Sequence, residues 1–200
     1  GWRAPRPHAF DLEYGTDTAS LAQAATLKGD PVNGNGHEPI DTVDFQRLMA
    51  DLPPLDLGQF TFVDFGAGQG RAVLLAAEYP LRRIVGVEHG LELVRSAEAD
   101  VARYLKSHSP RQRCRELRIE WADAAEWELP AGPTLFYFCE PFRAPMLRRM
   151  IGRIAESAAA APRPIYVLYV GAQAGLWDEN PAFRRVRARY EAHVYAAGTA

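Results

Sequence analysis

One short stretch in the middle of the chain constrains its fold more than any other feature. It lies between a β-rich run that predicts a strand over Thr61–Phe65 and an apolar run that predicts a helix over Arg71–Tyr79. The stretch reads Val63-Asp64-Phe65-Gly66-Ala67-Gly68-Gln69-Gly70-Arg71. Its glycines let a ligand lie against the main chain, and the unpaired N–H groups at the start of the helix favour a negative charge. The stretch therefore predicts a ligand-binding turn of an open α/β sheet.

The spacing of these glycines differs from that of a dinucleotide-binding loop. In the pattern G-x-G-x-x-G the third glycine would fall on Arg71, whereas this chain has its third glycine at Gly70. Two residues before the first glycine stands Asp64, a carboxylate where a dinucleotide site usually has an apolar residue. A carboxylate in this place suits a ligand that carries an ammonium group better than a pyrophosphate.

Strands and helices alternate along the rest of the chain, which predicts a doubly wound parallel sheet with helices on both faces. Further strands are expected over Arg83–Val87, Glu116–Trp121, Thr134–Phe138 and Ile165–Val170, and helices over Leu91–Lys106 and Met146–Ala161. The last two strands, Phe183–Tyr190 and Ala192–Ala196, are too close together for a crossover helix and predict an antiparallel hairpin. Before the sheet, helices are expected over Ala19–Lys28, capped by Thr18, and over Thr42–Asp51.

Composition limits the classes of partner that the chain is expected to have. Its 200 residues, 48% of them hydrophobic, fit one globular domain, and the net charge of −2 argues against a protein built mainly to bind nucleic acid. Because no apolar run approaches the ~20 residues that span a bilayer, no membrane partner is expected. Cys114 and Cys139 have neither the spacing of metal ligands nor that of a disulfide framework, so we expect no metal and a cytoplasmic location.

Carboxylates recur where the predicted strands end, which is the edge where open α/β sheets bind their ligands. Glu88 ends the second strand, next to His89, and is placed to accept hydrogen bonds from both hydroxyls of a ribose. Asp123 follows the third strand and can accept an adenine amino hydrogen, while the N–H of Ala124 serves a ring nitrogen. Glu140 follows the fourth strand and can orient or deprotonate a nucleophile.

Together these features resemble the class I S-adenosylmethionine-dependent methyltransferases over about residues 60–200. The resemblance implies an α/β fold with a mostly parallel seven-stranded sheet of order 3-2-1-4-5-7-6, the last strand being antiparallel. Residues 1–59 are then expected to form an N-terminal arm and a helical lid across the strand ends. The implied cofactor is S-adenosyl-L-methionine, which leaves as S-adenosyl-L-homocysteine.

The chain also resembles a little-described bacterial group within that superfamily. The resemblance rests on Tyr14-Gly15-Thr16-Asp17-Thr18 and on the turn before Pro141. Members of that group have Asn-Pro-Phe where this chain has Glu140-Pro141-Phe142. Because an ionised glutamate cannot donate the hydrogen bonds that an asparagine donates, methylation of an amide or adenine nitrogen is not inherited through this turn.

The resemblance implies a role for each of these residues. The expected cofactor-binding residues are Asp64, Gly66, Ala67, Gly68 and Gly70 for the methionine part, Glu88 and His89 for the ribose, Asp123 and Ala124 for the adenine, and Glu140 beside the methyl group. The expected catalytic residues are Glu140, Tyr14 and Asp17, the last two from the lid.

Two other functions compete with a methyltransferase that acts on a small molecule or on a nitrogen or oxygen nucleophile of a protein. The first is an NAD(P)-dependent oxidoreductase, against which Arg71, Asp64 and the closing hairpin all argue. The second is a non-catalytic subunit that binds the cofactor beside an active partner. The intact carboxylates and glycines predict binding of the cofactor in both the enzyme and the subunit, so only turnover separates them.

Overall fold

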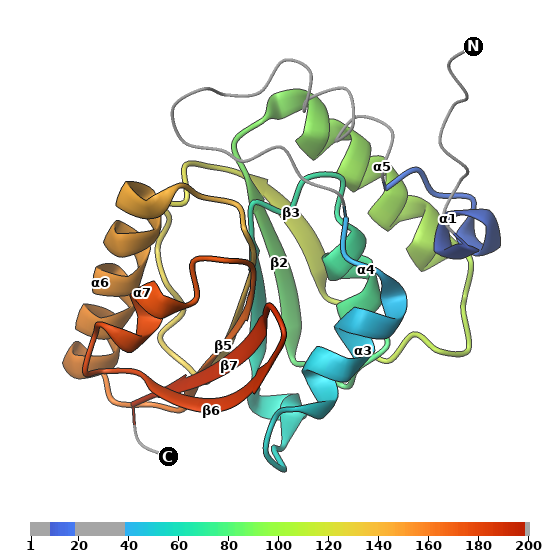
Figure 1. The fold of residues 1–200 in the computed structure, drawn as a ribbon. Helices are drawn as coiled ribbons and strands as arrows, with labels where there is room; N and C mark the ends of the chain where they lie inside the picture. The colour runs from blue at the N-terminus through green and yellow to red at the C-terminus, as the bar shows by residue number, and fades with distance from the viewer. Residues whose placement is uncertain (1–8, 19–38, 199–200) are drawn as a thin grey trace.

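Seven strands form one sheet at the centre of the computed structural model (Figure 1), which describes residues 9–18 and 39–198. Their order is β3-β2-β1-β4-β5-β7-β6. Neighbouring strands pair in parallel except at β7, which runs antiparallel to both β5 and β6. The strand order and the closing hairpin predicted from the sequence are confirmed.

The strands begin and end within one residue of their predicted bounds. They are β1 (Thr61–Phe65), β2 (Arg83–Glu88), β3 (Leu117–Trp121), β4 (Thr134–Cys139), β5 (Ile165–Val170), β6 (Arg184–Arg189) and β7 (Ala192–Ala197). β1 is buried along its whole length, and so is β4 up to its last residue. Both strands lie in the middle of the sheet with helices on either side, which is why their sequences are apolar almost throughout.

The helices agree less closely with their predicted bounds. They are α1 (Ala9–Tyr14), α3 (Thr42–Ala50), α4 (Arg71–Ala76), α5 (Leu91–Lys106), α6 (Ala144–Ala160) and α7 (Gly175–Asp178), with a 3₁₀ turn, η1 (Leu57–Gln59). α4 ends three residues early because the residue before Pro80 avoids the helical conformation. α6 begins two residues early, with a proline in its first turn, where the missing N–H has no helical partner to lose. The helix expected over Ala19–Lys28 lies outside the described residues.

The sheet carries helices on both faces, as predicted. Figure 1 shows α3, α4 and α5 on one side of the sheet and α6 and α7 on the other. Each side has its own cluster of buried apolar residues, one built around α3, α4 and α5 and the other around α6 and α7. Since side chains alternate across a strand, successive residues of β1 and β4 contribute to opposite clusters.

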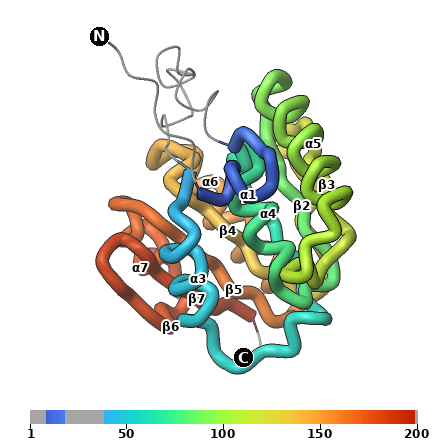
Figure 2. The backbone as a smooth tube through the Cα atoms, turned by 90° about the vertical axis from the view of Figure 1, so that its right-hand side faces the viewer, coloured from blue at the N-terminus to red at the C-terminus, as the bar shows by residue number. Residues whose placement is uncertain are grey.

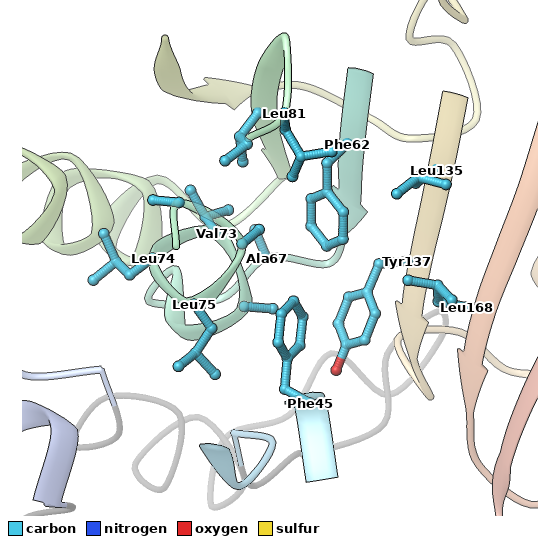
Figure 3. Close-up of a cluster of buried hydrophobic side chains, with 14 of the residues drawn as sticks. Phe45, Phe62, Ala67, Val73, Leu74, Leu75, Leu81, Leu135, Tyr137 and Leu168 are labelled. Atoms are coloured by element: carbon cyan, nitrogen blue, oxygen red, sulfur yellow. The ribbon is translucent and has the colours of Figure 1, made fainter. Parts of the chain in front are cut away.

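α3 packs into the first of these clusters rather than across the strand ends. Its Phe45 is fully buried, and its ring centroid lies 6.0 Å from that of Phe62 and 5.7 Å from that of Tyr137 (Figure 3). The apolar face of α3 therefore covers the sheet as a third helix of this layer. α3 thus lies outside the lid predicted over the N-terminal residues, whose positions 1–8 and 19–38 are outside the described residues.

α1 packs on the outer helices of the same side. Figure 2 shows it lying against α4 and α5. Phe10 and Tyr14 contact Tyr104 near the end of α5, with ring centroids 6.1 and 4.9 Å from the Tyr104 ring. The residues that follow α1, up to position 18, then approach the glycine loop.

Candidate functional site

The predicted site lies where β1, β2, β3 and β4 end together. Because these four strands are parallel and adjacent, the segments that follow them meet at one edge of the sheet. Those segments are the glycine loop (residues 66–70), the turn after Glu88, the turn around Asp123 and the turn at Glu140.

The glycine loop joins β1 to α4 through a backbone that other residues adopt only with strain. Gly66 and Gly70 have φ values of +74° and +85°, in the left-handed region. A Cβ atom on Gly66 would lie 2.5 Å from the Cβ of Pro141, so the turn after β4 rests directly on the first glycine. The loop and the Pro141 turn therefore form adjoining walls of one site.

Glu88 is a buried carboxylate that faces the loop from the β2 side, with 6% of its surface exposed. Its two carboxylate oxygens accept hydrogen bonds from the backbone N–H groups of Gly68, at 2.9 Å, and of Gly90, at 2.8 Å. Burial alone would raise its pKa, but hydrogen bonds from His89, Gly90 and Gly68 outweigh burial and hold the pKa below its usual value. Glu88 is therefore ionised at neutral pH.

Asp64 lies on the other side of the loop, and its pKa is shifted in the opposite direction from that of Glu88. Only 3% of its surface is exposed, and none of the residues that the structure describes donates a hydrogen bond to its carboxyl group. Burial, together with the charge of Glu88, raises the pKa of Asp64 to about 8. A buried carboxyl group without a partner is costly, and such a group is typical of a ligand site.

Asp64 lines a cavity of about 70 Å³ that opens on the β4 side of β1. Its walls are Asp64, Gly66–Gln69, Arg71, Ala72, Tyr137 and Cys139 together with Thr18, Pro39 and Ile40. Burial raises the pKa of the Cys139 thiol to about 11 and that of the Tyr137 hydroxyl above its usual range, so both groups are neutral. Asp64 is thus the carboxyl group that this cavity offers to a cation.

Glu140 turns away from this cavity towards the segment after β5. Its backbone is in the left-handed region, with φ +43°, and its carboxylate accepts a hydrogen bond from the backbone N–H of Ala172. A Cβ on Gly171 would lie 1.9 Å from Cγ of Glu140, so the glycine makes room for this side chain. The turns after β4 and β5 are therefore linked through Glu140.

The end of β3 supplies the last wall. Asp123 is exposed, and one of its carboxylate oxygens accepts a 2.8 Å hydrogen bond from the backbone N–H of Ala125. Trp121 is 64% exposed, and its indole N–H donates a 2.8 Å hydrogen bond to the carbonyl of His89. An exposed indole beside Glu88 offers a flat apolar surface at this end of the site.

Comparison with known proteins supports one fold. No protein-family model matches the chain. No curated protein matches its sequence. Similar solved structures include an RNA methyltransferase from Salinibacter ruber in complex with S-adenosyl-L-homocysteine, which is 17% identical with a TM-score of 0.53 over 80% of this chain and 92% of that chain.

Two further similar structures are of methyltransferases that are named for quite different substrates. Magnesium protoporphyrin IX methyltransferase from Synechocystis PCC 6803, with bound SAM, is 14% identical with a TM-score of 0.51 over 96% of this chain and 89% of that chain. Precorrin-6y C5,15-methyltransferase from Geobacter metallireducens is 13% identical with a TM-score of 0.54 over 86% of this chain and 96% of that chain.

This chain has the fold of the class I methyltransferases. At these identities the likeness shows the fold alone. The described part of this methyltransferase fold holds no helix that could cross a membrane. Within residues 9–18 and 39–198 no group of three metal-ligating side chains comes together.

The structure brings all of the predicted cofactor-binding residues, but not all of the predicted catalytic ones, to the same edge of the sheet. The predicted residues found there are Asp64, Gly66, Ala67, Gly68, Gly70, Glu88, His89, Asp123, Ala124 and Glu140. Tyr14 is not among them, because its hydroxyl group lies with Ser109 and Arg111, beyond the end of α5. The prediction that Tyr14 lies beside the methyl group does not fit these contacts. Asp17 does reach the loop, through its backbone, whose carbonyl accepts a 2.6 Å hydrogen bond from Gln69.

Four residues of this edge were not predicted from the sequence as site residues. They are Thr18, Gln69 and Arg71 beside the glycine loop, and Trp121 beside Glu88. Arg71 carried a signal, since it stands where a dinucleotide loop has glycine, but its partner is 60 residues away and cannot be recognised locally. Trp121 also carried a signal, because a tryptophan at the end of an edge strand has few neighbours to bury it.

Proposed function

We propose that the protein transfers a methyl group from S-adenosyl-L-methionine to an acceptor that is a small molecule or a nitrogen or oxygen nucleophile of a protein. The observation that carries this proposal is the pair of buried carboxyl groups on the two sides of the glycine loop. Asp64 has no partner on the cavity side, and Glu88 is ionised on the β2 side. A ligand with an ammonium group at one end and a diol further along satisfies both, whereas a pyrophosphate would meet two carboxyl groups.

The residues present fit this cofactor. Asp64 would bind the ammonium group of its amino-acid part, and the cavity beside it, of about 70 Å³, is small enough to take that end alone. Glu88 accepts hydrogen bonds from two backbone N–H groups and from His89, and because a carboxylate has about four lone-pair sites, it can still accept a hydrogen bond from a ribose hydroxyl. Asp123, Ala124 and His89, with the indole of Trp121, are proposed to surround the adenine.

The chemistry that this cofactor supplies is an in-line displacement, in which a nucleophile–carbon bond forms, the carbon–sulfur bond breaks and the nucleophile loses a proton. The chain has to align the acceptor and exclude water. Glu140 is proposed to orient the acceptor, from a position that the hydrogen bond to Ala172 fixes. The similar structures are named for RNA, porphyrin and precorrin substrates, so the fold does not select the acceptor, and RNA is one of the fractions that the labelling experiment below compares.

Ligand-dependent unfolding tests the proposal. S-adenosyl-L-homocysteine at about 100 times its Kd should stabilise the protein by about 2.7 kcal/mol, while NAD at the same concentration should leave the unfolding temperature unchanged. Asp64→Asn serves as the matched variant and should weaken the effect of S-adenosyl-L-homocysteine. A shift with NAD and none with S-adenosyl-L-homocysteine would instead support an oxidoreductase.

Turnover separates the enzyme from a non-catalytic subunit. S-adenosyl-L-methionine labelled in its methyl group should transfer label to one fraction of a cell extract divided into RNA, protein and small molecules. Cofactor binding with no labelled fraction would favour the non-catalytic subunit.

A further inference from the structure

Arg71 has a role that the proposed cofactor site does not explain. It is the first residue of α4, directly after the glycine loop, yet its side chain is 4% exposed and turns towards the N-terminal segment. Its guanidinium group donates a 2.9 Å hydrogen bond to Asp11 and another hydrogen bond to the hydroxyl of Thr18. Arg71 thus joins the glycine loop to residues about 60 positions earlier in the chain.

Asp11 completes this connection with its second carboxylate oxygen. That oxygen accepts hydrogen bonds from the hydroxyl of Thr16 at 2.8 Å, from the hydroxyl of Thr18 at 2.7 Å and from the backbone N–H of Thr18 at 3.1 Å. We call Asp11, Thr16, Thr18 and Arg71 the clamp. All four residues are buried, so their hydrogen bonds are strong and leave little freedom to the chain between positions 11 and 18.

Hydrogen bonds of Gln69, two positions before Arg71, also hold residues 16–18 against the glycine loop. Gln69, inside the glycine loop, donates hydrogen bonds from its side-chain amide to the carbonyl of Asp17 at 2.6 Å and to the hydroxyl of Ser96 at 3.1 Å. The backbone N–H of Asp17 donates a 3.2 Å hydrogen bond to Asp100 of α5. Residues 16–18 are therefore fixed against the loop from positions 69 and 71 at once.

This segment forms a wall of the cavity that holds Asp64. Thr18 lines that cavity together with Asp64, Tyr137 and Cys139. Tyr137 and Cys139 belong to β4, whereas Glu88 lies on β2. The cavity and the carboxylate of Glu88, which is proposed to bind the ribose, are therefore on opposite sides of β1. At about 70 Å³ the cavity is far below the ~300 Å³ of a typical ligand pocket, so it suits one small end of a ligand, next to the carboxyl group of Asp64.

We infer that the clamp makes residues 16–18 a specificity element, which closes the amino-acid end of the cofactor site and selects ligands that carry this end. The inference rests on the proposed function. Thr18 is the residue that faces the ligand, and Asp11 and Arg71 are positioning residues that act through it. A buried ion pair often contributes no more stability than apolar residues of the same volume, which is consistent with a role for this pair in placing Thr18.

Two ligands that differ only at this end test the inference. S-adenosyl-L-homocysteine carries the amino-acid part, and 5′-methylthioadenosine has the same adenosine and thioether without it. Calorimetry should show that the intact protein binds S-adenosyl-L-homocysteine at least tenfold more tightly. Thr18→Val, and the paired replacement Asp11→Leu with Arg71→Met, should each reduce this preference at least tenfold while the Kd for 5′-methylthioadenosine changes less than twofold.

Arg163→Met is the matched control. Arg163 is also a buried arginine with several hydrogen bonds, to Gly132, Ser157 and Ala161, but it lies at the opposite end of the sheet. Its replacement should lower the unfolding temperature and leave the preference intact. Thr18→Val keeps both charges of the clamp, so it decides the question if the paired variant does not fold.

The outcomes separate the two proposals. If the intact protein binds neither ligand, the proposed function fails. If it binds both ligands equally, or if Thr18→Val retains the full preference, the clamp does not select the amino-acid end. Loss of affinity for both ligands in parallel would also overturn the inference, because it would indicate a general loss of structure.

Discussion

At the scale of single residues, the electrostatics of Asp64 lead to a pH-dependent affinity. An ammonium ligand binds the ionised carboxylate, whereas burial keeps the pKa of Asp64 at about 8. Affinity for S-adenosyl-L-homocysteine should therefore rise between pH 6 and 8, by up to tenfold per pH unit, as the carboxyl group loses its proton. Calorimetry across this range measures the slope. Asp64→Asn should bind weakly and remove the slope, and an equal slope in that variant would assign the titration to another group.

The raised pKa of Asp64 also predicts that the stability of the ligand-free protein falls with rising pH, whereas ligand affinity rises. In the unfolded chain Asp64 ionises near its ordinary pKa of 3.8, while in the folded protein it keeps its proton up to about pH 8. The unfolded state loses the proton first, so stability falls as pH rises through this window. Asp64→Asn mimics the neutral form and should show a smaller decline in unfolding temperature between pH 5 and 8. A decline as steep as that of the unaltered protein would contradict the raised pKa.

A substitution at Glu140 can remove the charge of the side chain without removing the hydrogen bond that fixes its position. Glu140→Gln removes the charge but keeps an oxygen that can accept the hydrogen bond from Ala172. We expect transfer of labelled methyl groups to fall at least tenfold, while the Kd for S-adenosyl-L-homocysteine changes less than twofold. Unchanged transfer would remove the carboxylate of Glu140 from the reaction.

At the scale of secondary-structure elements, α3 shows how the N-terminal part of the chain supports the site. Phe45→Ala should lower the free energy of unfolding by about 3–5 kcal/mol, because it leaves a cavity between α3, β1 and β4. Denaturant unfolding measures this value. Val43 on the exposed side of the same helix gives the control, since Val43→Ala should cost far less. Equal effects of the two substitutions would show that α3 does not share the core.

The elements also show which features a sequence can reveal. The strands and α5 follow from local periodicity, because a buried strand or an amphipathic helix needs only its own residues to be recognised. The order of the strands came from the resemblance. The packing of α1 did not follow from either, since the pairs Asp11–Arg71 and Tyr14–Tyr104 join residues 60 and 90 positions apart. Local sequence therefore gives no means of predicting that aromatic contacts hold Tyr14 beside α5.

At the scale of the whole molecule, the site is built where segments from separate parts of the chain meet at one edge of the sheet. Residues 16–18, the glycine loop, Glu88, Trp121 and the Pro141 turn come from five different segments and share no single element. The two apolar clusters lie below them on either face of the sheet and hold the strand ends in place. Amides at this edge are therefore expected to exchange through local openings that leave most of the two clusters folded.

The location of these segments predicts where a bound ligand changes hydrogen exchange. With short labelling times, S-adenosyl-L-homocysteine should slow exchange in peptides that cover residues 14–18, 64–71, 88–92 and 119–125, because these surround the proposed site. Peptides from the opposite end of the sheet, around residues 157–165, should exchange at the same rate with and without ligand, since Arg163 and its partners lie far from every proposed contact. Mass spectrometry of the exchanged peptides measures both groups together.

Protection confined to residues 157–165 would place the ligand elsewhere. Protection of 64–71 and 88–92 without 14–18 would keep the cofactor site and exclude the clamp from it.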